Sequence, residues 1–150
     1  MAPSSPRRPN ELTQLLTRAE RAASRRLQAA LDAEGCSVET WRVLALLSDG
    51  AGHRMTEVAR AAFLPAPSLT KLVDHLVEQN LVHRRVDPLD RRRVLARLTP
   101  RGQEYWRRVD RAVRAGWPGL DPGEEDLLRA LLGRLVVTLE ERAVPRSAQV

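Results

Sequence analysis

Residues 67–102 read PSLTKLVDHLVEQNLVHRRVDPLDRRRVLARLTPRG and contain three structural signals in succession. In the first part, apolar residues recur at the i, i+3, i+4, i+7 and i+8 spacing of an amphipathic helix: Leu69, Leu72, Val73, Leu76 and Val77. Asn80 then suits the left-handed conformation that ends many helices. Two short strands are expected around the seven-residue connection DPLDRRR, and Thr99 and Pro100 predict the cap and first residue of another helix. The stretch therefore predicts a helix, a hairpin and a second helix.

The N-terminal half of the chain is predicted to add three helices and a small strand. Apolar residues recur at helical spacing from Glu11 to about Ala33, and a second helix is expected over roughly 38–48. Residues 53–55 fit a small strand, and Thr56 is a suitable N-cap for the short helix TEVARAA. The turn FLPAP then separates this short helix from the amphipathic helix of the opening stretch.

The C-terminal part is predicted to hold one more helix. The segment WPGLDPGEED breaks the helix that begins at Pro100. Asp121, Pro122 and Glu124 then suit the N-cap, N1 and N3 positions of a last helix over about 122–142. Apolar residues cover much of the circumference of this last helix, so a single small core would not bury them all.

The order of these elements defines a fold class. A short helix, a tight turn, an amphipathic helix and a two-stranded hairpin form a winged helix-turn-helix, with the hairpin as the wing. On the motifs WRVLALL, MTEVARAA and LTKLVDHLVEQNLVHRRVDPLDRRRVLARLTPRG, the sequence resembles the MarR family of bacterial transcriptional regulators. The resemblance covers residues 38–103 at motif level and about 11–142 by element order. The expected fold is mainly α with a small β-hairpin wing, a winged helix-turn-helix plus a helical dimerisation region.

The resemblance implies a homodimer in which the first and last helices of both copies intertwine. The leucines expected at this interface are Leu12, Leu15, Leu16, Leu128, Leu131, Leu132 and Leu135. The expected organisation is a disordered tail (1–10), one domain (11–142) and a C-terminal tail (143–150). Within the domain, the expected parts are dimerisation helices (11–34 and 121–142), a DNA-binding lobe (37–99) and a connecting helix (100–115).

The polar side of the amphipathic helix is the predicted recognition surface. N-terminal residues of a recognition helix face base edges in the major groove, so the predicted DNA-contacting residues are Pro67, Ser68, Thr70, Lys71 and His75. The alternative is an ordinary solvated helix face, because Asp74 and Glu78 lie on the same side. The neighbouring wing favours the DNA-binding interpretation.

The predicted wing carries a cluster of arginines whose charges repel one another. The wing residues expected to contact DNA are Arg84, Asp90, Arg91, Arg92 and Arg93. A solvated turn is the alternative, but the connection is longer than a hairpin needs and lies beside an already basic strand. The resemblance implies that Arg92 enters the minor groove, whose negative potential favours arginine. Asp90 is then expected to pair with a neighbouring arginine and steady the tip.

Composition supports a polyanion partner and disfavours several other classes. The formal net charge is +6 with a pI near 11.0, while aromatic residues make up 3% of the chain, too few for a single-strand stacking platform. The single cysteine, Cys36, excludes an intramolecular disulfide. No apolar run could serve as a signal peptide or membrane span, so a cytoplasmic protein without a membrane partner is expected.

Other functions find less support in the residues. Cys36 lies just after Gly35 rather than inside the first helix, so packing is favoured over redox sensing. The three histidines, His53, His75 and His83, have no ligand spacing, and no metal or other cofactor is expected. Trp41, Trp106 and Trp117 are interpreted as packing residues.

No nucleophile elbow, phosphate-binding loop, dinucleotide fingerprint or zinc-protease motif occurs in the sequence, so no enzyme is predicted. The expected function is a DNA-binding repressor whose affinity for its operator is reduced by a small-molecule effector. Two alternatives stay open: a helical protein–protein adaptor with a vestigial wing, and a regulator that senses oxidants through Cys36.

Overall fold

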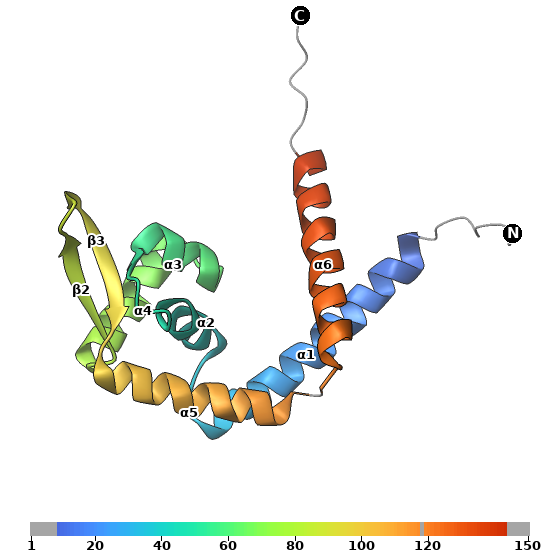
Figure 1. Cartoon of the computed structure of the whole chain (residues 1–150), viewed down its shortest axis with the longest axis horizontal. Helices are drawn as coiled ribbons and strands as arrows, with labels where there is room; N and C mark the ends of the chain where they lie inside the picture. Colours follow the sequence, from blue (N-terminus) through green and yellow to red (C-terminus); the bar gives the residue numbers. More distant parts are fainter. Residues whose placement is uncertain (1–8, 118, 144–150) are drawn as a thin grey trace, which may run out of the picture. The chain divides into compact units, whose positions relative to one another are not determined.

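The computed structural model describes residues 9–117 and 119–143, which form a mainly helical protein with one small antiparallel sheet (Figure 1). In chain order its elements are α1 (Pro9–Ala33), α2 (Val38–Leu47), β1 (His53–Arg54), α3 (Met55–Ala62), α4 (Ala66–Glu78), β2 (Val82–Asp87), β3 (Asp90–Leu98), α5 (Pro100–Gly116) and α6 (Pro122–Ala143). This order confirms the predicted fold class, a winged helix-turn-helix with additional helices.

The chain divides into two compact units, residues 1–117 and 118–150. The division falls in the segment WPGLDPGEED, where the sequence predicted a helix break. Most of the two predicted tails, residues 1–8 and 144–150, lies outside the described residues. Residues 9 and 10, expected in the N-terminal tail, are the first residues of α1.

The core of the first unit lies between α2, α3, α4 and the sheet, with α1 and α5 packed against it. On α4 the predicted apolar stripe is confirmed: Leu69, Val73 and Leu76 are fully buried, and Leu72 and Val77 pack beside them. Each such leucine or valine contributes about 1.5–3 kcal/mol by leaving water. The stripe therefore holds the inner side of α4 against the core and leaves its polar side in solvent.

The caps confirm most of the predicted helix boundaries. Thr99 Oγ1 accepts a hydrogen bond from Gly102 N at 2.9 Å, and Asp121 Oδ1 accepts one from Glu124 N at 3.1 Å. Asn80 has φ 57, as its predicted left-handed position requires.

The N-cap predicted for the short helix is wrong by two residues. Thr56 lies inside α3, which begins at Met55, and Arg54 is the N-cap residue. The Glu57 carboxylate accepts a hydrogen bond from Arg54 N at 3.2 Å, so the acid at the third helical position satisfies the free backbone donor.

The hairpin differs from the prediction in its connection. The expected seven-residue connection is wrong, because β2 runs to Asp87 and β3 begins at Asp90, which leaves Pro88 and Leu89 between them. Val86 pairs with Val94 and Asp87 pairs with Asp90, so Arg91, Arg92 and Arg93 form an irregular segment of β3 without partners on β2. The three arginines therefore lie along the outer part of the wing, in a bulge rather than a loop.

Candidate nucleic-acid interface

The five residues predicted on the recognition helix lie together on one exposed surface of α4. All five side chains are exposed: Pro67, Ser68, Thr70, Lys71 and His75. The Thr70 hydroxyl donates to Ala66 O at 2.9 Å, an i−4 bond that uses its proton within the helix. Lys71 makes no ion pair with the described residues, and His75 Nδ1 lies 3.9 Å from a Glu78 carboxylate oxygen. The ammonium group of Lys71 is therefore available to an external acceptor.

One of the two acids on this surface is neutralised by the wing. Arg84 Nη2 on β2 lies 2.5 Å from Asp74 Oδ1 on α4. This ion pair joins the recognition helix to the first wing strand. The prediction that Arg84 contacts DNA remains a prediction, and the guanidinium of Arg84 already has a protein partner. Sequence reasoning missed the pair because the two residues are brought together by the turn at Asn80 rather than by helical spacing.

The tip of the wing shows the ion pair that was predicted for Asp90. Arg93 Nε lies 3.0 Å from Asp90 Oδ2, and Asp90 Oδ1 accepts a hydrogen bond from Arg92 N at 3.0 Å. The side chains of Arg91 and Arg92 are exposed and have no carboxylate partner in the described part of the chain. The arginines of the wing thus fall into two groups, one bound to Asp90 and one free to meet an anion.

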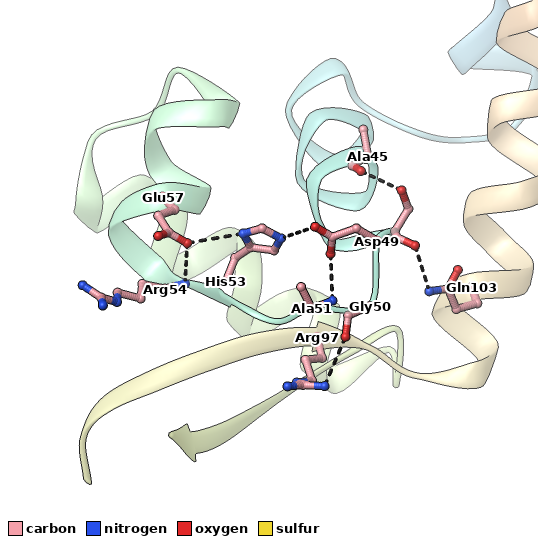
Figure 2. Close-up of polar contacts among 10 residues, drawn as sticks. Ala45, Asp49, Gly50, Ala51, His53, Arg54, Glu57, Arg97 and Gln103 are labelled. Atoms are coloured by element: carbon pink, nitrogen blue, oxygen red, sulfur yellow. Dashed lines mark hydrogen bonds and ion pairs between the residues drawn. The ribbon is translucent and has the colours of Figure 1, made fainter. Parts of the chain in front are cut away.

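The base of the wing is fixed to the turn between α2 and β1, as Figure 2 shows. Arg97 Nη1 on β3 donates to Gly50 O at 3.1 Å. Gly52, at φ +82, has no side chain, and a Cβ there would lie 2.6 Å from Arg97 Nε. A glycine at this position therefore gives both the left-handed backbone and the space that Arg97 occupies.

A second set of contacts in Figure 2 joins the end of α2 to the start of α3. His53 lies between two carboxylates, with Nε2 at 2.8 Å from Asp49 Oδ2 and Nδ1 at 3.3 Å from Glu57 Oε2. The Ala51 N–H, which donates to Asp49 Oδ1 at 2.9 Å, is the main cause that lowers the pKa of Asp49, and His53 adds to it. Glu57 also holds the backbone N–H of Arg54, so the same acid caps α3. These contacts fix the start of α3 against the end of α2.

Cys36 is buried and lies at the turn between α1 and α2, as its packing interpretation requires. Burial raises the pKa of its thiol, against a smaller lowering by a hydrogen bond with Tyr105. A buried thiol with a raised pKa is a poor nucleophile. Trp41 and Trp106 pack against the core as expected. Trp117 is half exposed, so the prediction that it is a packing residue is wrong.

A cavity of about 660 Å³ lies behind the recognition helix. It is lined from three sides: the turn after α1 with the start of α2, the rear edge of α4, and α5. Polar groups among its walls include Ser37, His75, Arg101, Tyr105 and Arg108. His75 therefore borders both the cavity and the exposed surface of α4. Among residues 9–117 and 119–143, no cluster of three metal-ligating side chains occurs, and no helix is long and apolar enough to cross a membrane.

The element order, the exposed recognition helix and the basic hairpin define a winged helix-turn-helix protein. The sequence model described as the MarR family matches residues 35–93, which run from the turn after α1 through the wing arginines. The helix-turn-helix and wing of this chain are therefore those of the MarR family.

Its relatives and structural neighbours carry names that agree with this assignment. The chain is 31% identical over 103 residues to an uncharacterized HTH-type transcriptional regulator, YkoM, of Bacillus subtilis, an alignment that covers 65% of this chain and 66% of the relative. It is 30% identical over 80 residues to a putative transcriptional regulatory protein for the hcr operon of Thauera aromatica, covering 53% of this chain and 48% of the relative. A MarR-family regulator from Rhodococcus sp. RHA1 superimposes with a TM-score of 0.72 at 26% identity, over 87% of this chain and 96% of that one.

Proposed function

We propose that this protein is a sequence-specific regulator of transcription that binds double-stranded DNA as a homodimer on a pseudo-palindromic operator and acts in the cytoplasm as a repressor. One observation carries the proposal. Lys71 on α4 and Arg91 and Arg92 on the wing have no ion-pair partner among the described residues, and the Asp74–Arg84 ion pair joins α4 to the first strand of the wing. A helix for the major groove and a basic hairpin for the adjacent minor groove are the two parts that a winged helix needs.

Electrostatics supports duplex DNA as the partner. The net charge of +6 favours association with a polyanion, and Asp74, one of the two acids on this surface that would repel phosphates, is paired with Arg84. The exposed side chains at the start of α4 offer hydrogen-bonding groups for base edges. A protein–protein adaptor would need none of these free cations on one surface.

Dimerisation is supported by the apolar surfaces of two helices, each considered by itself. On α1, Leu12 and Leu15 are exposed and Leu16 is partly exposed. On α6, Leu128, Leu131 and Leu132 are exposed, and Leu135 is the one partly buried residue among the described side chains of that helix. Contiguous apolar surface of this extent marks an interaction site in soluble proteins. The partner that we propose is a second copy of the chain.

A small-molecule effector is part of the proposal because of the cavity behind α4. Its volume lies within the range of ligand sites, and its walls combine Leu72, Leu76 and Leu81 with a few polar groups. A ligand in this cavity would touch His75 and the rear of the recognition helix. Binding there would favour one position of α4 over another and so change the affinity for DNA.

The experiment that tests the function starts with duplexes enriched by the wild-type protein from a random pool. Affinity is then measured for an enriched duplex and for its scrambled sequence. Lys71→Ala and His75→Ala should each lose on the order of 1–3 kcal/mol on the enriched duplex and flatten the preference at particular base pairs. Arg111→Ala, an exposed arginine on α5, is the matched control and should keep the wild-type preference.

Two results would contradict the proposal. Failure of the pool to enrich, together with weak and salt-insensitive binding, would favour the adaptor alternative. Wild-type preference in both α4 variants would mean that the recognition surface is wrongly assigned.

A further inference from the structure

The tip of the wing carries a leucine that the fold does not bury. Leu89 is 96% exposed, the highest value among the described large apolar side chains. Just below it, the cross-strand pair Val86 and Val94 is 55% and 41% exposed. Because Leu89 gains nothing from burial in this chain, its side chain adds no hydrophobic stabilisation to the wing.

The backbone holds Leu89 in place at the tip. Its N–H donates to Asp87 Oδ1 at 2.9 Å, and Pro88 before it has a fixed φ. On the other side, Asp90 Oδ1 accepts the N–H of Arg92 and its second oxygen binds Arg93. Both aspartates therefore use their side chains to order the turn. A leucine presented on an ordered turn loses less conformational entropy on binding than one on a mobile loop.

The charges around Leu89 indicate what kind of surface it meets. Four arginines, at positions 85 and 91 to 93, surround two aspartates, so the outer wing is positive. Arg91 and Arg92 have no carboxylate partner in the part of the chain that the structure describes, while both aspartates are engaged within the turn. The complementary surface is apolar at its centre and anionic at its edges. The minor groove of duplex DNA offers such a surface where a base step opens, because the apolar faces of the bases and the sugars then lie between two rows of phosphates.

We propose that Leu89 is an apolar wedge that enters the minor groove and partly unstacks one base step, with Arg91 and Arg92 binding the groove and phosphates beside it. Leucine is one of the side chains that proteins insert between base pairs, and such insertion kinks the duplex. The inference rests on the proposed DNA-binding function and adds that the protein bends the DNA duplex. Flexible pyrimidine–purine steps unstack most easily, so the operator should carry TA or CA/TG steps where the wing binds.

The test uses full-length protein and a duplex enriched from a random pool by the wild type. A 2-aminopurine base is placed at each candidate step beneath the wing, and donor and acceptor dyes at the duplex ends report bending. Wild type should raise the 2-aminopurine fluorescence at one step and shorten the end-to-end distance. Leu89→Ala should lose both signals and bind about tenfold more weakly, the loss expected when most of one leucine side chain no longer leaves water.

The control variant is Leu89→Met, which keeps a long apolar side chain and should keep most of the fluorescence, bending and affinity. All three proteins should unfold at the same temperature, because a side chain with 96% exposure adds little to the core. This separates a contact with DNA from a defect in folding.

The outcomes distinguish the two proposals. If the wild type enriches a duplex but Leu89→Ala matches it in affinity, fluorescence and bending, the wedge is wrong and the regulator function stands. If Leu89→Ala loses affinity although the wild type neither unstacks nor bends the duplex, Leu89 makes a surface contact and the wedge is again wrong. If no duplex is enriched, the proposed function fails and the wedge fails with it.

Discussion

The arginines of the wing are chemically alike but structurally different. Arg93 is bound to Asp90 at 3.0 Å, whereas Arg91 and Arg92 have no acidic partner among residues 9–117 and 119–143. To bind DNA, Arg93 must first break its ion pair with Asp90, which costs free energy. Arg91 and Arg92 have no such pair to break. We therefore expect Arg91 and Arg92 to contribute more to DNA affinity than Arg93.

Arg92→Ala should weaken binding selectively, because an arginine in a narrow A·T-rich minor groove depends on the shape of that groove. The measurement compares two operators that differ only in their flanks, A·T-rich or G·C-rich, across a salt series. The loss should be larger on the A·T-rich operator. Arg91→Ala should weaken both alike and make the slope of log affinity against log salt shallower by about one unit, as expected for one phosphate contact.

Equal losses on the two operators would make Arg92 another phosphate contact. No loss on either would restore the interpretation of a solvated turn. Arg111→Ala on α5 serves again as the control for net charge.

Cys36 should not act as an oxidant sensor. Burial raises the pKa of its thiol, so the reactive thiolate is scarce at neutral pH, and the side chain is closed off from solvent. Peroxide treatment should leave the DNA affinity of the wild type and of Cys36→Ser equally unchanged in a fluorescence anisotropy titration. A peroxide-dependent loss of binding that the serine variant lacks would show that this prediction is wrong.

At the scale of elements, the Asp74–Arg84 ion pair connects the recognition helix with the wing. Both side chains are partly exposed, so the pair should stabilise the fold only modestly, by about 0.2–1 kcal/mol. A double-mutant cycle with Asp74→Asn and Arg84→Gln, read from urea unfolding, measures this coupling. A coupling of zero would mean that the pair does not hold the two elements together.

The same cycle read from DNA affinity should also show coupling, because each variant alone breaks this ion pair between the wing and α4. Additive losses of affinity would instead mean that Asp74 and Arg84 act independently at the interface. The pair Asp110 and Arg114 on α5 offers a control ion pair, since both residues lie within one helix.

The helices could be predicted from sequence because their signals are local. The stripe of α4, the Thr99 cap and the capping box at Asp121 each depend on residues within one or two turns of helix. The hairpin connection could not be predicted in the same way. A strand is recognised from alternating apolar and polar residues, and the run RRR has no such alternation to indicate that the strand has already begun. The turn itself is closed by side-chain hydrogen bonds of the two aspartates.

For a similar reason, only part of the geometry of the candidate interface could be predicted from the sequence. Exposure of Lys71 and His75 follows from their place opposite the apolar stripe, which is a local property. The Asp74–Arg84 pair and the attachment of Arg97 to Gly50 join residues that are distant in sequence or on different elements. Only the folded arrangement of α4 and the sheet brings them within reach.

For the whole molecule, the apolar surface left exposed on α6 supports the proposed dimer. The helix α6 exposes leucines and valines over a broad arc, and every described side chain on it except Leu135 is exposed. Within its own unit this helix has no apolar partner surface among the residues that the structure describes. Apolar area of this size costs free energy in water, and a second copy that covers it would recover that cost.

The protein should therefore have twice the chain mass of 16.8 kDa in solution and bind half-sites centred about 10 base pairs apart, one turn of the double helix. Light scattering at micromolar concentration measures the mass, and duplexes with spacers changed by a few base pairs measure the spacing. Leu131→Glu places a charge in the apolar arc of α6 and should shift the protein towards monomer, with loss of operator affinity. Glu140→Lys, on the polar side of the same helix, should leave the mass unchanged. A monomeric wild type, or an affinity that ignores the spacer, would contradict a dimer that reads two half-sites.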